Sequence, residues 1–376
     1  MTAVFMEGIG VATPPYGATQ KRLVHFISDA LALPSEDARF VRRVGERSGI
    51  DHRFACILER ETHDVEPLAQ RFYPVAGVEP DLGLRMRAFV EHAGRLAVDA
   101  ASRALRDASH AGTDSRTISH LVTFSCTGFA SPGFDDAIVR SLGLAPTMKR
   151  MHIGFMGCHA AINALRAAQN IVESDAGSRV LLAGVELSSL HLHRSSRRDQ
   201  LVASCIFGDG AAAAIVSARP GGPYRLVDTA SLHVPGTSGA MAWTIGERAF
   251  EMSLSDGVPA LLAEHVPRLM PRWCESLRSD PEALRSRGLW CIHPGGPRVL
   301  SEVMNALDLA SGSDAGSREI LRRYGNMSST TTLFILDRMR REAVEASTPC
   351  VALAFGPGLV IESAMLIRER AVEPPR

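Results

Sequence analysis

The sequence predicts an α/β protein made of two similar halves, on three observations. Apolar runs of strand length alternate with helical patterns along the chain, as they do when helices cover both faces of a sheet. The second part of the chain repeats this order of elements in pattern, though not in residue identity. At 376 residues the chain is long enough for two similar domains or one large layered domain.

In the first half, apolar residues spaced three or four apart predict helices, and short apolar runs predict strands. The segment Pro34-Ser35-Glu36-Asp37 has a capping pattern that predicts the start of a helix. We expect strands at 3–13, 121–125, 179–185 and 207–217, and helices at 19–31, 35–47, about 84–109, and directly after Cys158.

The run Arg219-Pro220-Gly221-Gly222-Pro223 is the densest cluster of chain-breaking residues in the middle of the chain. It predicts a boundary between an N-terminal half, residues 1–220, and a C-terminal half, residues 221–376. In the second half we expect strands at 225–233, 289–292, 351–355 and 359–367, helices at 256–277, 297–307 and 327–345, and a frayed tail from residue 368.

Composition excludes several classes of partner. Hydrophobic residues make up 45% and charged residues 22%, which is typical of a soluble globular protein. Lys plus Arg and Asp plus Glu number 41 each, so we expect neither nucleic acid nor an anionic membrane surface as a partner. The N-terminus lacks a signal-peptide pattern and no apolar run reaches membrane-span length, which predicts a cytoplasmic protein.

The seven cysteines are odd in number and widely scattered, at positions 56, 126, 158, 205, 274, 291 and 350. None forms a C-x-x-C pair. The spacing therefore predicts neither a disulfide framework nor a metal site, and most of these thiols are expected to be reduced core residues.

Cys158 lies where a glycine-flanked turn becomes a helix that is apolar on nearly every face. The first turn of a helix has unpaired N–H groups and partial positive charge, which favours a thiolate. This position is typical of a nucleophile. The alternative is a small buried residue in a tightly packed helix, because cysteine is among the most buried residue types.

Two polar residues occupy comparable positions. His293 ends the apolar run 289–292 and precedes Pro294-Gly295-Gly296-Pro297, a turn that lets backbone and imidazole approach a ligand closely. Asn326 lies between Gly325 and a predicted helix. Taken singly, His293 is also explained as a satisfied structural histidine and Asn326 as a helix cap. Together with Cys158 they form a candidate catalytic set.

A Cys, His, Asn order also occurs in papain-like proteases, and the separation of Cys158 and His293 falls in the range of that class. The C-G-x-C-W context of those proteases is absent, and Cys158 lies in mid-chain. These two differences make a papain-like protease the weaker interpretation of the Cys, His and Asn set.

The motifs GFMGCHAAINAL, CIFGDGAAA, CIHPGGP, YGNMSS and AFGPG together resemble the type III polyketide synthases, the chalcone-synthase-like branch of the thiolase superfamily. The resemblance runs from about residue 4 to 367. Ketoacyl synthase III enzymes share the three polar residues but usually lack the HPGGP and FGPG loops. The resemblance implies a thiolase-like α/β fold, two pseudo-repeated halves in αβαβα layers, and a homodimer.

The resemblance further implies that Cys158 takes the starter acyl group from CoA, while His293 and Asn326 point donors at the thioester oxygen of malonyl-CoA. Loss of CO₂ leaves an enolate, so the site needs preorganised donors more than a strong base. His293 as imidazolium would hold Cys158 as thiolate before loading. Acyl-CoA and malonyl-CoA are then substrates, and no cofactor or metal is expected.

Other positions are assigned by resemblance alone. Phe207 corresponds to a gatekeeper between the CoA tunnel and the cavity, and Met252 to a second gatekeeper. Arg53 and Arg298 are candidates for the CoA phosphates, although Asp51 is acidic where the family is basic. The remaining cavity residues are Cys126, Thr127, Ser131, Ser188, His191 and Ser328, with Ser131 where a methionine would reach into the partner subunit, and the predicted cyclisation loop is Phe355, Gly356, Pro357 and Gly358.

The predicted function is iterative decarboxylative condensation of malonyl-CoA onto an acyl-CoA starter, followed by cyclisation. The run ELSSLHLH, residues 186–193, is more similar to bacterial enzymes that use fatty acyl starters and release alkylpyrones or alkylresorcinols. The alternatives are a single condensation of the ketoacyl synthase III type and a non-condensing thiolase-fold protein that binds acyl-CoA.

Overall fold

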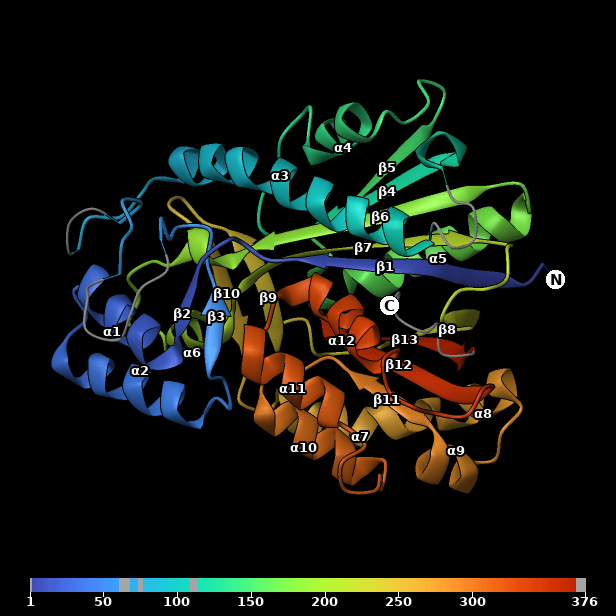
Figure 1. The fold of residues 1–376 in the computed structure, drawn as a ribbon. Coiled ribbons are helices and arrows are strands. Elements are labelled where there is room, and N and C mark those ends of the chain that lie inside the picture. The colour runs from blue at the N-terminus through green and yellow to red at the C-terminus, as the bar shows by residue number, and fades with distance from the viewer. Residues whose placement is uncertain (1, 61–67, 74–76, 109–113, 370–376) are drawn as a thin grey trace.

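The computed structural model describes residues 2–60, 68–73, 77–108 and 114–369 (Figure 1). Strands and helices alternate in both halves, as expected. The first half contains β1 Val4–Ala12, β2 Gly17–Thr19, α1 Gln20–Ala30, α2 Ser35–Arg47, β3 His52–Phe54, α3 Leu82–Ala108, β4 His120–Ser125, α4 Phe134–Leu142, β5 Lys149–Gly154, α5 Ala160–Ser174, β6 Arg179–Leu187, α6 Arg198–Ile206 and β7 Asp209–Ser217.

The second half follows the same alternation and ends in a long hairpin. Its elements are β8 Tyr224–His233, β9 Met241–Ile245, β10 Phe250–Leu254, α7 Val258–His265, α8 Met270–Leu277, α9 Pro281–Arg287, β11 Leu289–Ile292, α10 Pro297–Ala306, α11 Ala315–Tyr324, α12 Thr331–Met339, β12 Thr348–Gly356 and β13 Val360–Arg368.

Strands from both halves form one hydrogen-bonded sheet in the order β11-β12-β13-β8-β1-β7-β6-β4-β5. The pairs β4–β5, β4–β6 and β11–β12 are parallel, and the other pairs in this sheet are antiparallel. The two halves meet where β1 pairs with β8 over only three residues, Val4 to Met6. Beyond this short pairing, the strands of the two halves separate, and a layer of helices lies between them.

That central layer consists of α5 and α12. Helix α5 contacts β4 and β6 of the first half and β8 and β13 of the second, and α12 contacts β1 and β7 as well as β11 and β12. Helix α3 covers the outer face of β1, β7 and β6, while α8 and α9 contact β8, β12 and β13 (Figure 1). The layers are therefore helix, sheet, helix, sheet, helix, as the resemblance implied.

Small residues allow the central helix α5 to be buried between two sheets. Ala160, Ala161, Ala164 and Ala168 are all at most 1% exposed. Their methyl side chains let the backbone approach strands on both sides, and every buried residue adds to the hydrophobic stabilisation. The pattern that is apolar on nearly every face thus correctly predicted a core helix.

Several element boundaries differ from the prediction. The helix expected at 256–277 is divided into α7, a 3₁₀ turn Val266–Leu269, and α8. Pro267 and Pro271 lack the amide N–H that a continuous helix requires at those positions. The expected tail begins later, because Arg368 is a fully buried residue at the end of β13; residues 370–376 lie outside the described residues.

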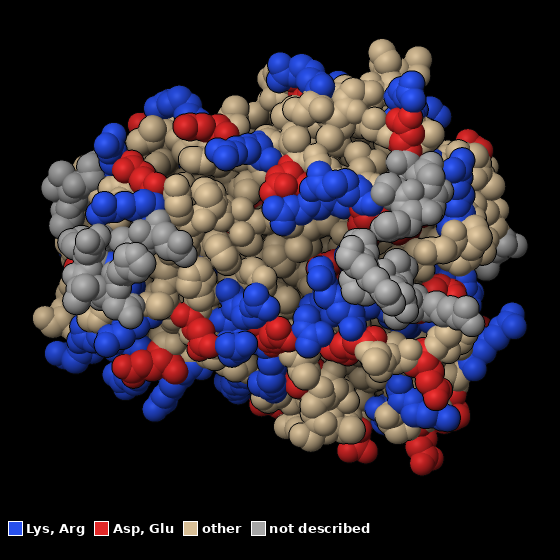
Figure 2. Space-filling model, viewed as in Figure 1, with Lys and Arg blue, Asp and Glu red and all other residues tan. Residues whose placement is uncertain are grey.

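Charged side chains of both signs are mixed over the visible face of the molecule. Figure 2 shows Lys and Arg interspersed with Asp and Glu rather than gathered in areas of one sign. Among the described residues, none of the helices combines the length and apolar character needed to cross a membrane.

Candidate active site

The two central helices begin at the same place, and their first turns form the centre of the site. Cys158 lies in a 3₁₀ turn, Gly157–His159, that leads into α5, and Ser328 lies in the matching turn that leads into α12. The Cys158 thiol donates a hydrogen bond to Ser328 Oγ across 3.5 Å. Phe155 and Ser328 both have left-handed backbones, with φ of 60° and 49°. Such conformations are uncommon for non-glycine residues and cluster at functional sites.

The loop after β12 packs directly on the turn that carries Cys158. A Cβ added to Gly157 would lie 2.2 Å from Pro357 Cδ, and a Cβ added to Gly356 would lie 2.2 Å from His159 Cδ2. Both distances are shorter than any real Cβ contact, so these positions need glycine. The predicted cyclisation loop therefore also fixes the position of the nucleophile turn.

His293 is delivered to the site by the end of β11. Its backbone N–H donates to the carbonyl of Leu353 on β12, at 2.8 Å. The side chain is 1% exposed, and neither ring nitrogen has a hydrogen-bond partner among the described residues. An unsatisfied buried imidazole is costly in a structural role, which argues against the alternative of a satisfied structural histidine.

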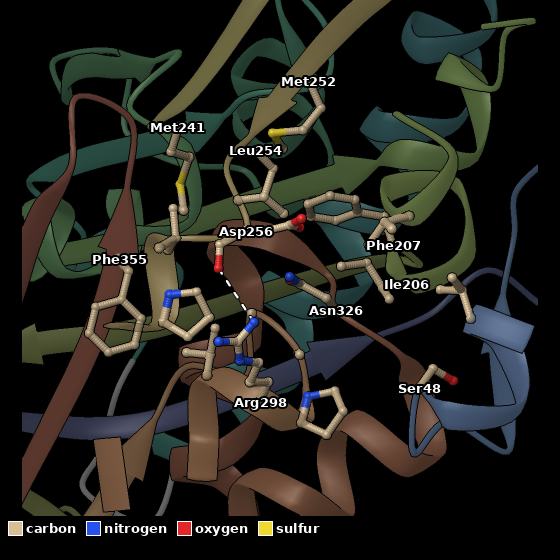
Figure 3. A pocket seen from close by; sticks show the side chains of 18 of the residues that line it. Ser48, Ile206, Phe207, Met241, Met252, Leu254, Asp256, Arg298, Asn326 and Phe355 are labelled. Carbon is tan, nitrogen blue, oxygen red and sulfur yellow. Dashed lines mark hydrogen bonds between the residues drawn. The ribbon is translucent and has the colours of Figure 1, made fainter. Parts of the chain in front are cut away.

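Asn326 is held by its backbone beside the end of α6. Its N–H donates to the carbonyl of Ile206 and its own carbonyl accepts from the N–H of Gly208, both at 2.9 Å. Its Oδ1 accepts the N–H of Ser328 at 2.8 Å. These bonds fix the amide, and Figure 3 shows its nitrogen pointing into the pocket.

A pocket of about 470 Å³ opens in front of Cys158, His293 and Asn326. Apolar side chains make up most of its wall, whereas arginines lie at its rim. The apolar lining includes Phe40, Val44, Val202, Ile206, Phe207, Met241, Met252, Leu254, Val258, Pro259, Leu262, Val299 and Phe355. Arg298 contacts the carbonyl of Asp256 across this rim (Figure 3).

A second, much smaller chamber of about 30 Å³ lies on the other side of Cys158. Phe207, Met241 and Met252 line both cavities and so separate them. The other residues that line the inner chamber are Cys126, Thr127, Gly157, Ser188, Trp243, Ser328 and Pro357.

Burial sets the charge state of the reactive groups. It raises the pKa of the Cys158 thiol to about 12, against a smaller opposing effect of the hydrogen bond to Ser328. Burial also lowers the pKa of His293 to about 3, and the nearby His159 adds to this. Burial therefore favours the neutral thiol and the neutral imidazole over the thiolate and imidazolium that the resemblance implied.

A buried carboxylate lies directly behind the inner chamber. Glu186 accepts hydrogen bonds from the backbone N–H of Cys126 and from the hydroxyls of Thr127 and Ser329. Desolvation dominates over these bonds and raises the pKa of Glu186 to about 7. The hydrogen of the Thr127 hydroxyl is therefore donated to the carboxyl group of Glu186.

The structure brings most of the predicted residues together and places three elsewhere. Arg53 is only 4% exposed, and its guanidinium donates to Gln20 and to the carbonyls of Ser204 and Phe207, so it cannot reach CoA phosphates at the rim. His191 is buried behind the inner chamber and lines neither cavity. Ser131 is exposed on a loop outside both cavities.

Three residues at the site were not predicted from the sequence. Arg43 and Arg47 lie at the rim of the outer pocket, and neither pairs with an acidic residue in the described part of the chain. Their spacing of four in a predicted helix places them on one face and was an available signal. Trp243 lies on β9, in a segment for which no element had been predicted.

Comparisons with known proteins point to one family over nearly the whole chain. Residues 2–220 match the family described as chalcone and stilbene synthases, N-terminal domain, and residues 225–370 match the corresponding C-terminal domain. Among curated proteins, an alpha-pyrone synthesis polyketide synthase-like Pks18 from Mycobacterium tuberculosis is 30% identical over 372 residues, covering 97% of this chain and 91% of the relative.

Solved structures of similar fold include several type III polyketide synthases. The C-terminal domain of Steely1, a type I/III hybrid from Dictyostelium, has a TM-score of 0.88 at 26% identity, covering 98% of this chain and 100% of that domain. PKS-I from the brown alga Ectocarpus siliculosus has a TM-score of 0.86 at 28% identity, covering 98% and 99%. The fungal enzyme ORAS, at 23% identity and a TM-score of 0.84 over 97% and 100%, shows the fold alone.

Proposed function

The chain belongs to the chalcone and stilbene synthase family and is a type III polyketide synthase, and from this premise we propose how its own residues carry the reaction. The observation that carries the proposal is the His293 ring, buried and without a hydrogen-bond partner among the described residues, facing the same pocket as Cys158 and the Asn326 amide. The acyl starter is loaded on Cys158, and malonyl-CoA enters through the outer pocket.

Loading uses the neutral pair. The Cys158 sulfur attacks the thioester carbonyl of acyl-CoA as His293 takes the thiol proton, and the C–S bond to CoA then breaks. A neutral imidazole in an apolar pocket can accept this proton, and the CoA thiolate recovers it as it leaves. The acyl group is then a thioester on Cys158, and His293 is neutral again.

Condensation uses His293 and Asn326 as donors. One N–H from the imidazole and one from the Asn326 amide bind the thioester oxygen of malonyl-CoA. As CO₂ leaves, the electron pair of the broken C–C bond forms an enolate whose charge lies on that oxygen. The enolate carbon attacks the acyl carbonyl, a new C–C bond forms, and the Cys158 sulfur leaves. Transfer of the extended chain back to Cys158 starts the next cycle.

Cyclisation releases the product. We propose a pyrone or resorcinol ring bearing an alkyl chain, supported by the apolar outer pocket and by the relative named for alpha-pyrone synthesis. Phe207 and Met252 separate the two cavities and act as the gatekeepers. Arg43, Arg47 and Arg298 at the rim are suited to bind the CoA phosphates, because arginine binds phosphate oxygens in pairs.

The reaction needs CoA thioesters, and no metal step is part of this proposal. Within the described residues, no group of three or more His, Cys, Asp or Glu side chains is arranged to hold a metal ion.

We further propose that the enzyme works as a homodimer of two-half subunits, residues 1–220 carrying Cys158 and residues 221–376 carrying His293 and Asn326. Within the described part of the chain, strand β5 lies at the edge of the sheet and pairs only with β4. Met151 on this strand is 50% exposed. Met156, just after the strand, and Phe129, whose ring packs against Phe155, are also exposed. Unpaired edge strands with apolar side chains are usually covered by a partner. A second copy of this chain is the proposed partner.

Incubation with labelled malonyl-CoA and acyl-CoA starters of increasing chain length, followed by mass spectrometry, tests the proposed function. The wild type should give products extended by two or more malonyl units, whereas Cys158→Ala should give none and still release CO₂, since the donors remain. Cys274→Ala, on α8 and away from both cavities, is the matched control and should behave as wild type. A product extended once would indicate single condensation, and a folded wild type that condenses no starter would overturn the proposal.

A further inference from the structure

The inner chamber has no room for a long acyl chain on Cys158. At about 30 Å³ it holds roughly two water molecules, because one water needs at least ~10–15 Å³ of such volume. In the proposed function the outer pocket receives the next CoA thioester, so the chain already bound to Cys158 needs space on the inner side. Loading of a long starter therefore requires part of the inner wall to move.

One hairpin supplies much of that wall. Met241 and Trp243 on β9 and Met252 on β10 line the inner chamber. Met241, Met252 and Leu254 also line the outer pocket, and Figure 3 shows these three together on one side of it. In the described part of the chain, β9 and β10 form a two-stranded sheet of their own. A lone two-stranded hairpin is only marginally stable, so its position depends on contacts with the rest of the molecule.

Gln200 and Arg197, at the start of α6, hold Met252 by its backbone. The N–H of Met252 donates to Gln200 Oε1 at 2.8 Å, and the carbonyl oxygen of Met252 accepts from Arg197 Nη2 at 3.0 Å. Gln200 is 4% exposed and Met252 is 8% exposed, so the bond between them is buried. A buried N–H that loses its acceptor is costly, and this bond therefore fixes β10 against α6.

The same pattern continues along the outer edge of β10. The N–H of Leu254 donates to Asp199 Oδ2, and the N–H of Phe250 donates to His191 Nδ1, both at 3.2 Å. Residues 250, 252 and 254 alternate along the strand, so their N–H groups face one edge. Side chains thus occupy the place of a third strand. Unlike the backbone of a strand, a side chain can turn away by rotation about its own bonds.

Strand β9, in contrast, is joined to the segments beside Cys158. The carbonyl oxygen of Met241 accepts the N–H of Gly358 at 3.0 Å, and the indole N–H of Trp243 donates to the carbonyl oxygen of Cys126 at 2.7 Å. A displacement of the hairpin is therefore expected to begin at β10, where side chains hold the edge.

From these observations, and resting on the proposed function, we propose that Gln200 is a positioning residue that controls entry of the acyl chain to the inner side of Cys158. Its bond to Met252 holds β10 across the passage between the two cavities. When a long acyl chain is transferred to Cys158, this bond opens, β10 shifts together with Met252, and the chain occupies the enlarged chamber. The bond slows loading of long starters and has little effect on short ones.

Two variants of α6 test this role. Gln200→Leu removes the acceptor at nearly the same volume, and Asp199→Ala removes the neighbouring acceptor. Ser204→Ala is the matched control, because its hydroxyl donates to the carbonyl oxygen of Gln200 within α6 and its side chain lines neither cavity. Rates of acylation by a short-chain and a long-chain acyl-CoA are measured without malonyl-CoA by intact mass, and Cys158→Ala identifies the acylated residue.

Gln200→Leu should raise the ratio of long-chain to short-chain acylation by roughly two- to tenfold, the factor that corresponds to the net contribution of one hydrogen bond. Asp199→Ala should change the ratio in the same direction, and Ser204→Ala should leave it unchanged. A loss of packing alone would slow both starters together, so a rise in the ratio is specific to the proposed role.

Hydrogen exchange of residues 250–254, followed by mass spectrometry, gives a second readout. In the wild type, long-chain acylation should speed exchange of these amides, whereas short-chain acylation should not. In Gln200→Leu the exchange should already be fast without an acyl group. Thermal unfolding of each variant confirms that it is folded.

The proposal is overturned if folded Gln200→Leu and Asp199→Ala both keep the wild-type ratio, or if they lose acylation by both starters in parallel. It is also overturned if residues 250–254 exchange equally in the free and the long-chain-acylated wild type. Failure of the proposed function is seen separately, as a wild type that is not acylated or that forms no condensation product.

Discussion

The His293 imidazole and the Asn326 amide line the same pocket as Cys158, and the two ring nitrogens of His293 have no hydrogen-bond partner among the described residues. Their separate contributions can be measured by decarboxylation of malonyl-CoA in a Cys158→Ala background, where no condensation follows. His293→Ala and Asn326→Ala should each slow CO₂ release by about 10²–10³-fold, the typical value of one donor to a developing oxyanion. Cys158→Ala alone is the control. Equal rates in all three variants would contradict the assigned roles.

His191 makes stability depend on pH. Burial lowers the pKa of His191 from 6.5 to about 3, and a proton on Nδ1 would face the N–H of Phe250. Between these two pKa values the unfolded chain binds a proton that the folded chain does not, so stability falls as the pH decreases from about 6.5 to 3. His293 acts in the same direction. Glu186, whose pKa burial raises from 4.5 to about 7, acts oppositely.

The variant His191→Gln keeps a donor and an acceptor but removes this titration. Urea unfolding at a series of pH values between about 7 and 4 should show a smaller loss of stability on acidification than the wild type, by up to ~1.4 kcal/mol for each pH unit. Profiles that remain parallel over this range would show that His191 already carries its proton in the folded protein.

For single residues, the sequence indicated site candidates where the side-chain chemistry and the position at the end of an element both suggested a reactive group. Cys158, His293 and Asn326 each follow or precede glycines at the end of an element, and the structure places all three around one pocket. Arg53 was assigned wrongly because a sequence does not show which arginine satisfies buried carbonyls. Trp243 was missed because the inner chamber that it lines is formed by residues far apart in the chain. Its ring contact with His191, for example, joins residues about 50 positions apart.

At the scale of elements, the contact between the loop after β12 and the turn before α5 gives a further prediction. Gly356→Ala places a methyl group against the His159 ring, and Gly157→Ala adds backbone strain at φ 78° to a clash with Pro357. Overpacking of this kind costs about 1–3 kcal/mol. Both variants should therefore unfold at lower temperature and lose activity, because the turn that carries Cys158 must shift.

The matched control is Gly239→Ala, a glycine before β9 with no positive φ and, among the described residues, no atom within 4 Å of its added Cβ. Thermal unfolding and turnover are measured on all three variants. If Gly356→Ala and Gly157→Ala were as stable and as active as Gly239→Ala, the loop after β12 would not position the nucleophile.

Elements with strong apolar periodicity were predictable, and short or interrupted ones were not. Strands β1, β4, β6 and β7 and helix α5 match their predicted positions because burial on both faces produces continuous apolar runs. Strand β5 was missed because four of its residues are exposed and its sequence, KRMHIG, carries charge. Its stability comes from pairing with β4, which local sequence does not reveal.

At the scale of the whole molecule, the site exists only because the two halves come together. Cys158 is in the first half, and His293 and Asn326 are in the second. The turns before α5 and α12 meet across the pseudo-repeat, at the Cys158 and Ser328 contact. A repeat of pattern predicted the two halves, but the meeting of their central helices depends on long-range packing. Isolated halves should therefore lack this pocket.

The oligomeric state also depends on the whole molecule, through the surface that it exposes at the edge of the sheet. The exposed edge of β5 and the apolar side chains of Met151, Phe129 and Met156 form a surface that a second copy would cover. Met151→Arg would place a guanidinium in that interface. An unpaired buried charge costs several kcal/mol, which raises the dissociation constant of the dimer by at least ~10²-fold. Val78→Arg, at an equally exposed apolar position beside α1, is the matched control.

Light scattering coupled to size-exclusion chromatography measures the outcome directly. The wild type and Val78→Arg should elute with the mass of two chains, and Met151→Arg should shift toward the mass of one chain as the protein is diluted. Because β5 leads through Phe155 to the Cys158 turn, the monomer should also lose turnover. A wild type with the mass of one chain, or a Met151→Arg variant that stays dimeric at the lowest concentration measured, would show that another surface or another partner covers this edge.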